Sequence, residues 1–194
     1  LYIKGRVTDD APINTVLLSY YNGFIWTNIS MTKVDSNVYE YTITNLSPAT
    51  TINIVIYAQD KALNWNKSST LSMYVKDVYG PTIQLVSILP EEPRKGDNVT
   101  VKVLVLDLVE IEEVILSYYD GKTWHNVSMT RQGDYYIGSF KALKGNQDYQ
   151  LKVYARDSDG NWNIETLGSV HVAEKGFVPD YLSIIIGIII GVLV

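Results

Sequence analysis

A repeat about as long as a domain constrains this chain more than any other feature. Leu17–Thr32 reads LLSYYNGFIWTNISMT and Ile115–Thr130 reads ILSYYDGKTWHNVSMT, so that ten of the sixteen residues are identical. Two further pairs of segments match, YIKGRVTDD with TVKVLVLDL and, after one deleted residue, IYAQDKALNWN with VYARDSDGNWN. Similarity over such a period indicates one fold used twice. We therefore predict two domains, residues 1–78 and 79–174.

Both copies have the composition of β-strands. Hydrophobic residues make up 46% of the chain, and they include 15 tyrosines and many isoleucines and valines, which favour pleated, half-buried strands. Asn22-Gly23 and Asp120-Gly121 are typical of two-residue type I′ hairpin turns. Alternating polarity in the second copy predicts seven strands, near Thr82–Ile88, Val99–Leu106, Glu113–Tyr119, Thr123–Thr130, Tyr135–Lys141, Tyr149–Arg156 and Ile164–Val172.

The first copy has no counterpart of the strand at Thr82–Ile88, because Tyr2 already aligns with the second strand of the pattern. A sandwich without its N-terminal strand exposes an unpaired edge. Two explanations stay open: the sequence is part of a longer chain, or a strand from another subunit pairs with this edge.

Three segments resemble known β-sandwich modules. KGNQDYQLKVYARDSDGNWN (Lys144–Asn163) resembles the last hairpin of fibronectin type III and related immunoglobulin-like domains, and LSPATTINIVIYAQDKALNWN is a weaker copy. LPEEPRKGDNVTVKV (Leu89–Val103) resembles the immunoglobulin-like modules of prokaryotic surface proteins, although the tryptophan usual in the second strand of fibronectin modules is missing. The resemblance implies an all-β chain of two tandem sandwiches. It also implies that Tyr149 is a tyrosine-corner residue whose hydroxyl bonds the preceding loop, with Ile52 in its place in the first copy.

No catalytic machinery is evident. The chain has no cysteine, which excludes disulfides and thiolate sites. His125 and His171 lie in different predicted strands, without the spacing of a zinc site or a Ser-His-Asp triad. The net charge of -5 and the scattered basic residues argue against a nucleic-acid partner. We expect a protein that is not an enzyme and that has no cofactor, apart from the structural calcium considered next.

Acidic residues concentrate where two loops of the second sandwich should meet. In such a fold, the loop after the second strand and the loop before the last strand lie at the same pole. Carboxylate oxygens there could bind a calcium ion that stiffens the joint between domains, or they could form a solvated acidic rim. The candidate ligands are Asp107, Glu110, Asp157 and Asp159, with Glu112 and Asp77 nearby.

The chain contains five N-x-S/T sequons, which are acceptors for N-linked glycans on exported proteins. Their asparagines are Asn28, Asn45, Asn66, Asn98 and Asn126. Asn28 and Asn126 fall inside the repeated phrase, two residues after a tryptophan. Strand alternation puts each Trp–Asn pair on the outer face, where the indole could pack against the first sugar. The alternative is that the tryptophan covers an edge and the sequon is incidental.

The C-terminal end is uncharged from Tyr181 to Val194. Residues 182–194 would give about 20 Å of helix, against a hydrocarbon core of about 30 Å. We interpret them as the start of a longer transmembrane helix after a linker of residues 175–181; a buried core strand is the alternative. Gly187 and Gly191 form a G-x-x-x-G motif, through which two such helices could associate.

These features together predict a stalk on the outer face of a cell membrane, held by one C-terminal helix. The stalk would hold a surface layer (S-layer), a filament or an upstream head domain away from the membrane. Resemblance to glycosylated, single-helix surface proteins favours an archaeal source. Two alternatives remain: an adhesin that binds glycan or protein, and the membrane-proximal stalk of a surface hydrolase whose catalytic domain lies outside these residues.

Overall fold

The computed structural model describes residues 1–176, and these residues contain strands and turns without any helix. They form two compact units. Unit 1 comprises residues 1–79 with the loops 108–110 and 158–161, and unit 2 comprises residues 80–107, 111–157 and, of the described residues, 162–176. Within residues 1–176, no helix has the length and apolar character that crossing a membrane requires.

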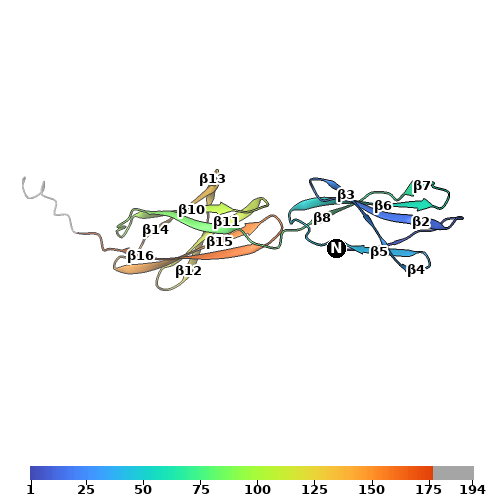
Figure 1. The fold of residues 1–194 in the computed structure, drawn as a ribbon. Helices are drawn as coiled ribbons and strands as arrows, with labels where there is room; N and C mark the ends of the chain where they lie inside the picture. The colour runs from blue at the N-terminus through green and yellow to red at the C-terminus, as the bar shows by residue number, and fades with distance from the viewer. Residues whose placement is uncertain (177–194) are drawn as a thin grey trace, which may run out of the picture. The chain divides into compact units, whose positions relative to one another are not determined.

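Unit 1 contains two facing sheets (Figure 1). One has the strand order β1-β5-β4, and the other has the order β3-β2-β6-β7, with β8 also pairing with β6. Its strands are β1 (Tyr2–Arg6), β2 (Ile13–Tyr21), β3 (Trp26–Ser30), β4 (Thr32–Asp35), β5 (Val38–Thr42), β6 (Thr50–Asp60), β7 (Trp65–Lys67) and β8 (Leu71–Val75).

Unit 2 has the same design with one additional strand in its first sheet. The sheets have the orders β13-β14-β10-β9 and β12-β11-β15-β16, and all the pairs are antiparallel. Its strands are β9 (Thr82–Leu89), β10 (Asn98–Leu106), β11 (Ile111–Tyr119), β12 (Trp124–Ser128), β13 (Thr130–Gln132), β14 (Tyr135–Lys141), β15 (Gln147–Asp157) and β16 (Trp162–Val172). The first sheet thus holds the first, second, fifth and sixth strands of the unit, which correspond to strands A, B, D and E of an immunoglobulin-type sandwich.

The strand predicted at Thr123–Thr130 is wrong as a single element. It divides into β12, which pairs with β11, and β13, which pairs with β14 in the opposite sheet. Met129 lies at the switch with its side chain 8% exposed, and its backbone N–H donates to Val114 O at 2.9 Å. A continuous apolar alternation does not reveal where a strand leaves one sheet for the other, and Met31 makes the same switch in unit 1.

The type I′ prediction for the two hairpin turns is also wrong. Both loops have four residues, because Asn22 N donates to Ile25 O and Asp120 N donates to Thr123 O. Only the glycines of these loops have positive φ, +97° at Gly23 and +84° at Gly121. The side chain of Asn22 stabilises the loop instead. Its Oδ1 accepts hydrogen bonds from the backbone N–H groups of the two residues before β3, each at 3.0 Å.

The core of unit 2 includes the tyrosine corner that the resemblance implies. The Tyr149 side chain is 1% exposed, and its hydroxyl accepts a hydrogen bond from Lys144 N at 3.0 Å. Its ring lies 5.4 Å from that of Phe140, which in turn stacks on Tyr118 at 4.1 Å. In unit 1 the equivalent Ile52 is equally buried but offers no hydroxyl, so the loop before it lacks this bond.

Candidate functional site

All five sequon asparagines are exposed. The burial alternation predicted around two of them is confirmed: residues at Trp26, Asn28 and Ser30 are exposed and those between them are half-buried, and β12 shows the same pattern. The same alternation, continued one residue back from Trp26, predicts that Ile25 faces the core, but Ile25 is 62% exposed because it lies in the turn before β3. Asn28 and Asn126 therefore occupy equivalent outer positions in the two units.

The tryptophan beside each of these asparagines packs on a tyrosine across the hairpin. The Tyr21 and Trp26 ring centroids are 5.7 Å apart, and those of Tyr119 and Trp124 are 5.5 Å apart. In unit 2 the Lys152 ammonium lies 4.7 Å from the Trp124 ring centroid and occupies one of its faces. A sugar on Asn126 would have to use the remaining face of this ring.

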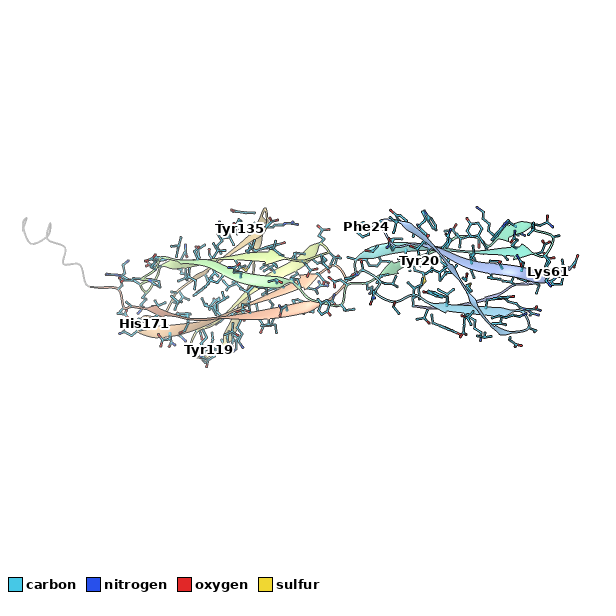
Figure 2. All side chains as sticks on the ribbon, viewed as in Figure 1. Tyr20, Phe24, Lys61, Tyr119, Tyr135 and His171 are labelled. Carbon is cyan, nitrogen blue, oxygen red and sulfur yellow. The ribbon has the colours of Figure 1, made fainter. Side chains whose placement is uncertain are left out.

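Figure 2 shows that Tyr119 and Tyr135 project from opposite outer faces of unit 2. They come from β11 and β14, which belong to different sheets of the sandwich. The Lys102 ammonium lies 4.2 Å from the Tyr135 ring centroid. A lysine ammonium group therefore lies over an aromatic ring on each face, Lys152 over Trp124 and Lys102 over Tyr135. These contacts make both surfaces polar as well as aromatic.

A functional candidate that the sequence reasoning missed is the apolar tip of the β2–β3 turn. Phe24, Ile25 and Trp26 are consecutive and are 77%, 62% and 54% exposed. The equivalent turn of unit 2 carries Lys122 and Thr123 before its tryptophan. Two large apolar residues after Asn-Gly, where a turn is expected to be polar, were the available signal.

The turn of unit 2 has an acidic residue that is held in its ionised form. Asp120 Oδ1 accepts from the backbone N–H groups of Thr123 and Lys122, each at 2.9 Å, and these bonds lower the pKa of the carboxyl well below its usual range. Lys144 and His125 lie 3.2 Å and 3.3 Å from Oδ2 and act in the same direction. The arrangement is a charged turn rather than a proton-transfer site, because every partner favours the carboxylate.

The predicted calcium ligands divide between the two units. Asp107 and Asp157 belong to unit 2, where their carboxylate oxygens lie within 4.8 Å of each other and the Asp157 side chain is 0% exposed. Glu110 and Asp159 group with unit 1. Asp159 Oδ2 accepts from Asp77 N at 2.7 Å and from the Tyr74 hydroxyl at 3.1 Å.

The residues near these ligands have other partners. Glu112 forms an ion pair with Arg156 at 2.8 Å. Glu110 contributes its backbone carbonyl, which accepts from Ser158 N at 2.8 Å. Of the predicted ligands, Asp107 and Asp157 are therefore the pair that unit 2 brings together.

The two histidines are engaged in local contacts. His171 Nδ1 lies 2.7 Å from Asp148 Oδ1 on the surface, and the His125 ring stacks on Tyr118 at 5.0 Å between centroids. Neither histidine is paired with a serine or a threonine in these contacts. Gly187 and Gly191, and the membrane helix predicted for 182–194, lie outside the described residues.

Unit 1 has a groove between the end of β1 and the β6–β7 hairpin. Its volume is about 620 Å³, and its walls include Val7, Ile56, Ala58 and Asn66. Asp60 lies at its end and is 8% exposed, with its two carboxylate oxygens accepting from the backbone and side-chain nitrogens of Asn64 at 2.9 Å. These bonds lower the pKa of Asp60.

No protein-family model matches the chain. No curated protein matches it. Among solved structures, the fibronectin(III)-like modules of Clostridium thermocellum CbhA are 16% identical with a TM-score of 0.42, and the match covers 92% of this chain and 89% of that one. A tetra-tandem repeat from the extending region of a large adhesion protein is 17% identical with a TM-score of 0.48, covering 87% of this chain and 45% of that one. The amphioxus IgVJ-C2 molecule is 11% identical with a TM-score of 0.46, covering 88% and 96%. The assignment of the fold rests on the strand pairing described above.

Proposed function

We propose that the chain is a glycosylated structural module of a cell-surface protein, with the two sandwiches acting as a stalk. The observation that carries this proposal is the exposure of all five sequon asparagines, two of them at equivalent outer positions beside a tryptophan. N-glycans require an exposed acceptor on an exported chain, so an extracellular location belongs to the same proposal.

Glycopeptide mass spectrometry on protein from its natural source tests the glycosylation. We expect hexose-containing modifications at Asn28 and Asn126. A Trp26→Ala variant should leave glycan on Asn28 while making it more accessible to glycosidase, because the indole no longer covers the first sugar. Unmodified Asn28 and Asn126 in native material would refute this part of the proposal.

The stalk role predicts that the chain holds other domains without a ligand of its own. Support comes from two sandwiches that each pack an apolar core although the chain has no cysteine. Adding protease to intact cells should cleave the protein, and detergent should be needed to release the fragment that retains residues 182–194. Full protection from external protease would contradict the surface location. The partners in this proposal are an S-layer protein, which the stalk would hold, and a second copy of the chain, which would associate through Gly187 and Gly191.

A second candidate function, protein or glycan binding as an adhesin, is favoured by the exposed tip at Phe24, Ile25 and Trp26. A stalk should show no saturable binding on glycan arrays or to extracellular proteins of its source. Saturable binding that a Phe24→Ser/Ile25→Ser double variant abolishes would favour the adhesin. The matched control is Lys122→Ser/Thr123→Ser in the equivalent turn of unit 2.

We also propose calcium as a stabilising ion, with Asp107 and Asp157 as its ligands in unit 2. The support is that two carboxylates lie within 4.8 Å of each other, one of them fully buried. Calcium prefers oxygen ligands and would reduce the repulsion between them.

A further inference from the structure

The hairpin between β11 and β12 is surrounded by lysines, although the chain as a whole has a net charge of -5. Lys122 lies in its turn, and the ammonium groups of Lys144 and Lys152 reach it from the segment before β15 and from β15 itself. Asp120 lies among them, with Lys144 Nζ at 3.2 Å from its Oδ2. We call Lys122, Lys144 and Lys152 the cationic cluster. Three ammonium groups against this carboxylate leave the hairpin positively charged.

The repeat shows that unit 1 forms the same hairpin without these charges. The two hairpins have the same register, because Tyr21 pairs with Trp26 as Tyr119 pairs with Trp124. None of the residues that replace the cationic cluster, Asp120 and His125 in unit 1 is charged: they are Phe24, Ser47, Val55, Asn22 and Thr27. The fold therefore does not require the lysines, and their gathering around one hairpin calls for another explanation.

The side chain of Lys152 crosses the sheet toward β12. Ser117 of β11 pairs with Lys152 on one side and with Asn126 on the other, so these three residues form a row across the outer face. The Lys152 ammonium lies 4.7 Å from the ring centroid of Trp124, which belongs to β12. Its stem therefore passes over Ser117, which is only 2% exposed. The ammonium ends close to Asn126, because Asn126 lies two residues after Trp124 on the same face.

Lys152 carries a charge that the protein does not neutralise. None of the ion pairs within residues 1–176 involves it. The carboxylates of Glu113 and Asp148, on the same strands β11 and β15, are already paired with Arg156 at 3.4 Å and His171 at 2.7 Å. An aromatic ring stabilises an ammonium group but leaves its charge in place. Lys152 is therefore available to an anion that approaches this face.

An anionic sugar matches these features. A carboxylate or sulfate group supplies the charge that Lys152 lacks, and the carbon atoms of a sugar ring can pack on the face of Trp124 that Lys152 leaves free. Asn126 is the point at which a glycan would be attached, and its backbone lies about 10 Å from that of Lys152, two strand spacings away. The position of Lys152 and Trp124 on the side of the sheet, beside the sequon, favours a sugar over a membrane surface.

We propose that the cationic cluster binds an anionic sugar of the glycan on Asn126. Lys152 holds the acidic group and Trp124 positions Lys152, while the other two lysines raise the local potential. The inference rests on the proposed glycosylation of Asn126. Because the attached glycan fills the site in the native protein, it agrees with a stalk that binds no free saccharide. The glycan on Asn28 would lack this contact, since Val55 takes the place of Lys152.

The first test uses the full 194-residue chain, produced without glycans so that the site is empty. The probe is a disaccharide of glucuronic acid and N-acetylglucosamine, and its neutral control has glucose in place of glucuronic acid. We expect the acidic disaccharide to shift the nuclear magnetic resonance signal of the Trp124 indole N–H saturably. Binding should weaken at high salt, which screens exposed charges. The Trp26 indole N–H is the internal control and should not shift.

Exchanging single residues between the units locates the site. Lys152→Val installs the unit 1 residue and should weaken binding about 2- to 5-fold, as expected for one exposed ion pair, whereas Lys152→Arg should preserve it. Val55→Lys should produce a saturable shift of the Trp26 indole N–H in unit 1. The matched control is Lys102→Val, which removes the lysine over Tyr135 on the opposite face and should have no effect.

Glycopeptide mass spectrometry on native protein identifies the source of the sugar. A uronic acid or a sulfated sugar in the glycan on Asn126 would support the proposal. A neutral glycan there would overturn it and leave the proposed glycosylation intact. An unmodified Asn126 would refute the glycosylation and with it the source of the sugar; the cluster would then take an anionic saccharide from another molecule if the glycan-free chain binds the probe.

Three results with the glycan-free chain would overturn the cluster as a sugar site: no shift at Trp124, equal shifts with the acidic and the neutral disaccharide, or equal affinity of Lys152→Val and wild type. Phosphatidylglycerol vesicles that shift the Trp124 signal where the disaccharide does not would assign the cluster to a membrane surface instead.

Discussion

The two units come from one repeat but differ in how completely they bury their cores. Unit 2 buries seventeen hydrophobic residues in one cluster, and unit 1 buries seven. The central positions agree, since Leu18 and Leu116 are both 0% exposed. The difference arises at the edge, where Val101 and Val103 of β10 are 0% exposed and their counterparts Ile3 and Gly5 in β1 are only half-buried.

This comparison shows that a single edge strand can determine how deeply the core side chains on that side of a sandwich are buried. β9 covers β10 in unit 2, and no described residue does the same for β1. Unit 1 has adapted in part, because Gly5 leaves room for Ile56, whose Cδ1 would lie 2.6 Å from a Cβ at that position. We expect unit 1 to be the less stable of the two as an isolated chain.

The largest effect should come from deleting a central leucine in each unit. Leu116→Ala should lower the free energy of unfolding of unit 2 by about 2–5 kcal/mol, because the cavity is enclosed on all sides. Leu18→Ala should cost unit 1 about 2 kcal/mol or less, since its open edge lets the core relax. Urea unfolding followed by tryptophan fluorescence measures both, as each unit has two tryptophans. Equal losses would mean that the cores are equally closed.

Removing the tyrosine-corner hydroxyl should have the next largest effect. Tyr149→Phe leaves Lys144 N without its partner and should destabilise unit 2 by about 1–3 kcal/mol. Ile52→Val at the same position of unit 1 is the matched control and should cost less, because no hydrogen bond is lost there. The comparison would fail if Tyr149→Phe had no effect on the urea midpoint of unit 2.

Calcium should act on unit 2 and leave unit 1 unchanged. Asp107 and Asp157 belong to a cluster of acidic side chains whose oxygens lie within 4.8 Å of one another, whereas their counterparts in the repeat, Asp9 and Asp60, belong to no such cluster among the described residues. Calcium at ten times its Kd should stabilise unit 2 by about 1.4 kcal/mol, and Asp107→Asn should remove this gain. A urea midpoint of unit 2 that is identical in calcium and in chelator would refute the proposed ion.

The smallest effect concerns pH. Because the pKa of Asp120 is lowered by folding, its carboxylate stabilises unit 2 above the unfolded pKa of about 4, and this contribution is lost as the pH falls. Asp120→Asn installs the residue that unit 1 has at Asn22, and it should shift the acid midpoint of unit 2 by less than about half a pH unit. Superimposable pH profiles of variant and wild type would show that the carboxylate does not contribute.

Much of the fold could be predicted from the sequence because the repeat and the alternating polarity record burial directly. Six of the seven strands predicted for unit 2 and the outward direction of Asn28 and Asn126 followed from these patterns, whereas the tyrosine corner at Tyr149 followed from the resemblance to fibronectin-like modules. The switch at Met129 could not, since the same alternation continues through both sheets. The turns were mistaken because Asn22 and Asp120 use their side chains to accept hydrogen bonds instead of adopting positive φ.

The groove of unit 1 was harder to predict. A counterpart of the strand at Thr82–Ile88 was missing from the alignment of the copies, but the walls of the groove come from segments far apart in the sequence, such as those of Val7 and Asn66. In unit 2 the residue equivalent to Asn66 is Asn163, whose side-chain amide donates to the Pro81 carbonyl, and that contact joins residues 82 positions apart. The apolar tip at Phe24 and Ile25 was missed because a turn is expected to be polar.

The central claim is that unit 1 has an unpaired strand edge where unit 2 has a paired one. Amide hydrogen exchange of the free chain, measured by nuclear magnetic resonance, tests it at equivalent residues. Tyr2, Lys4 and Arg6 should exchange at least about 100-fold faster than Thr100, Lys102 and Leu104, because only the second set donates to a neighbouring strand. Equal protection at the two sets in a monomeric chain would contradict the claim.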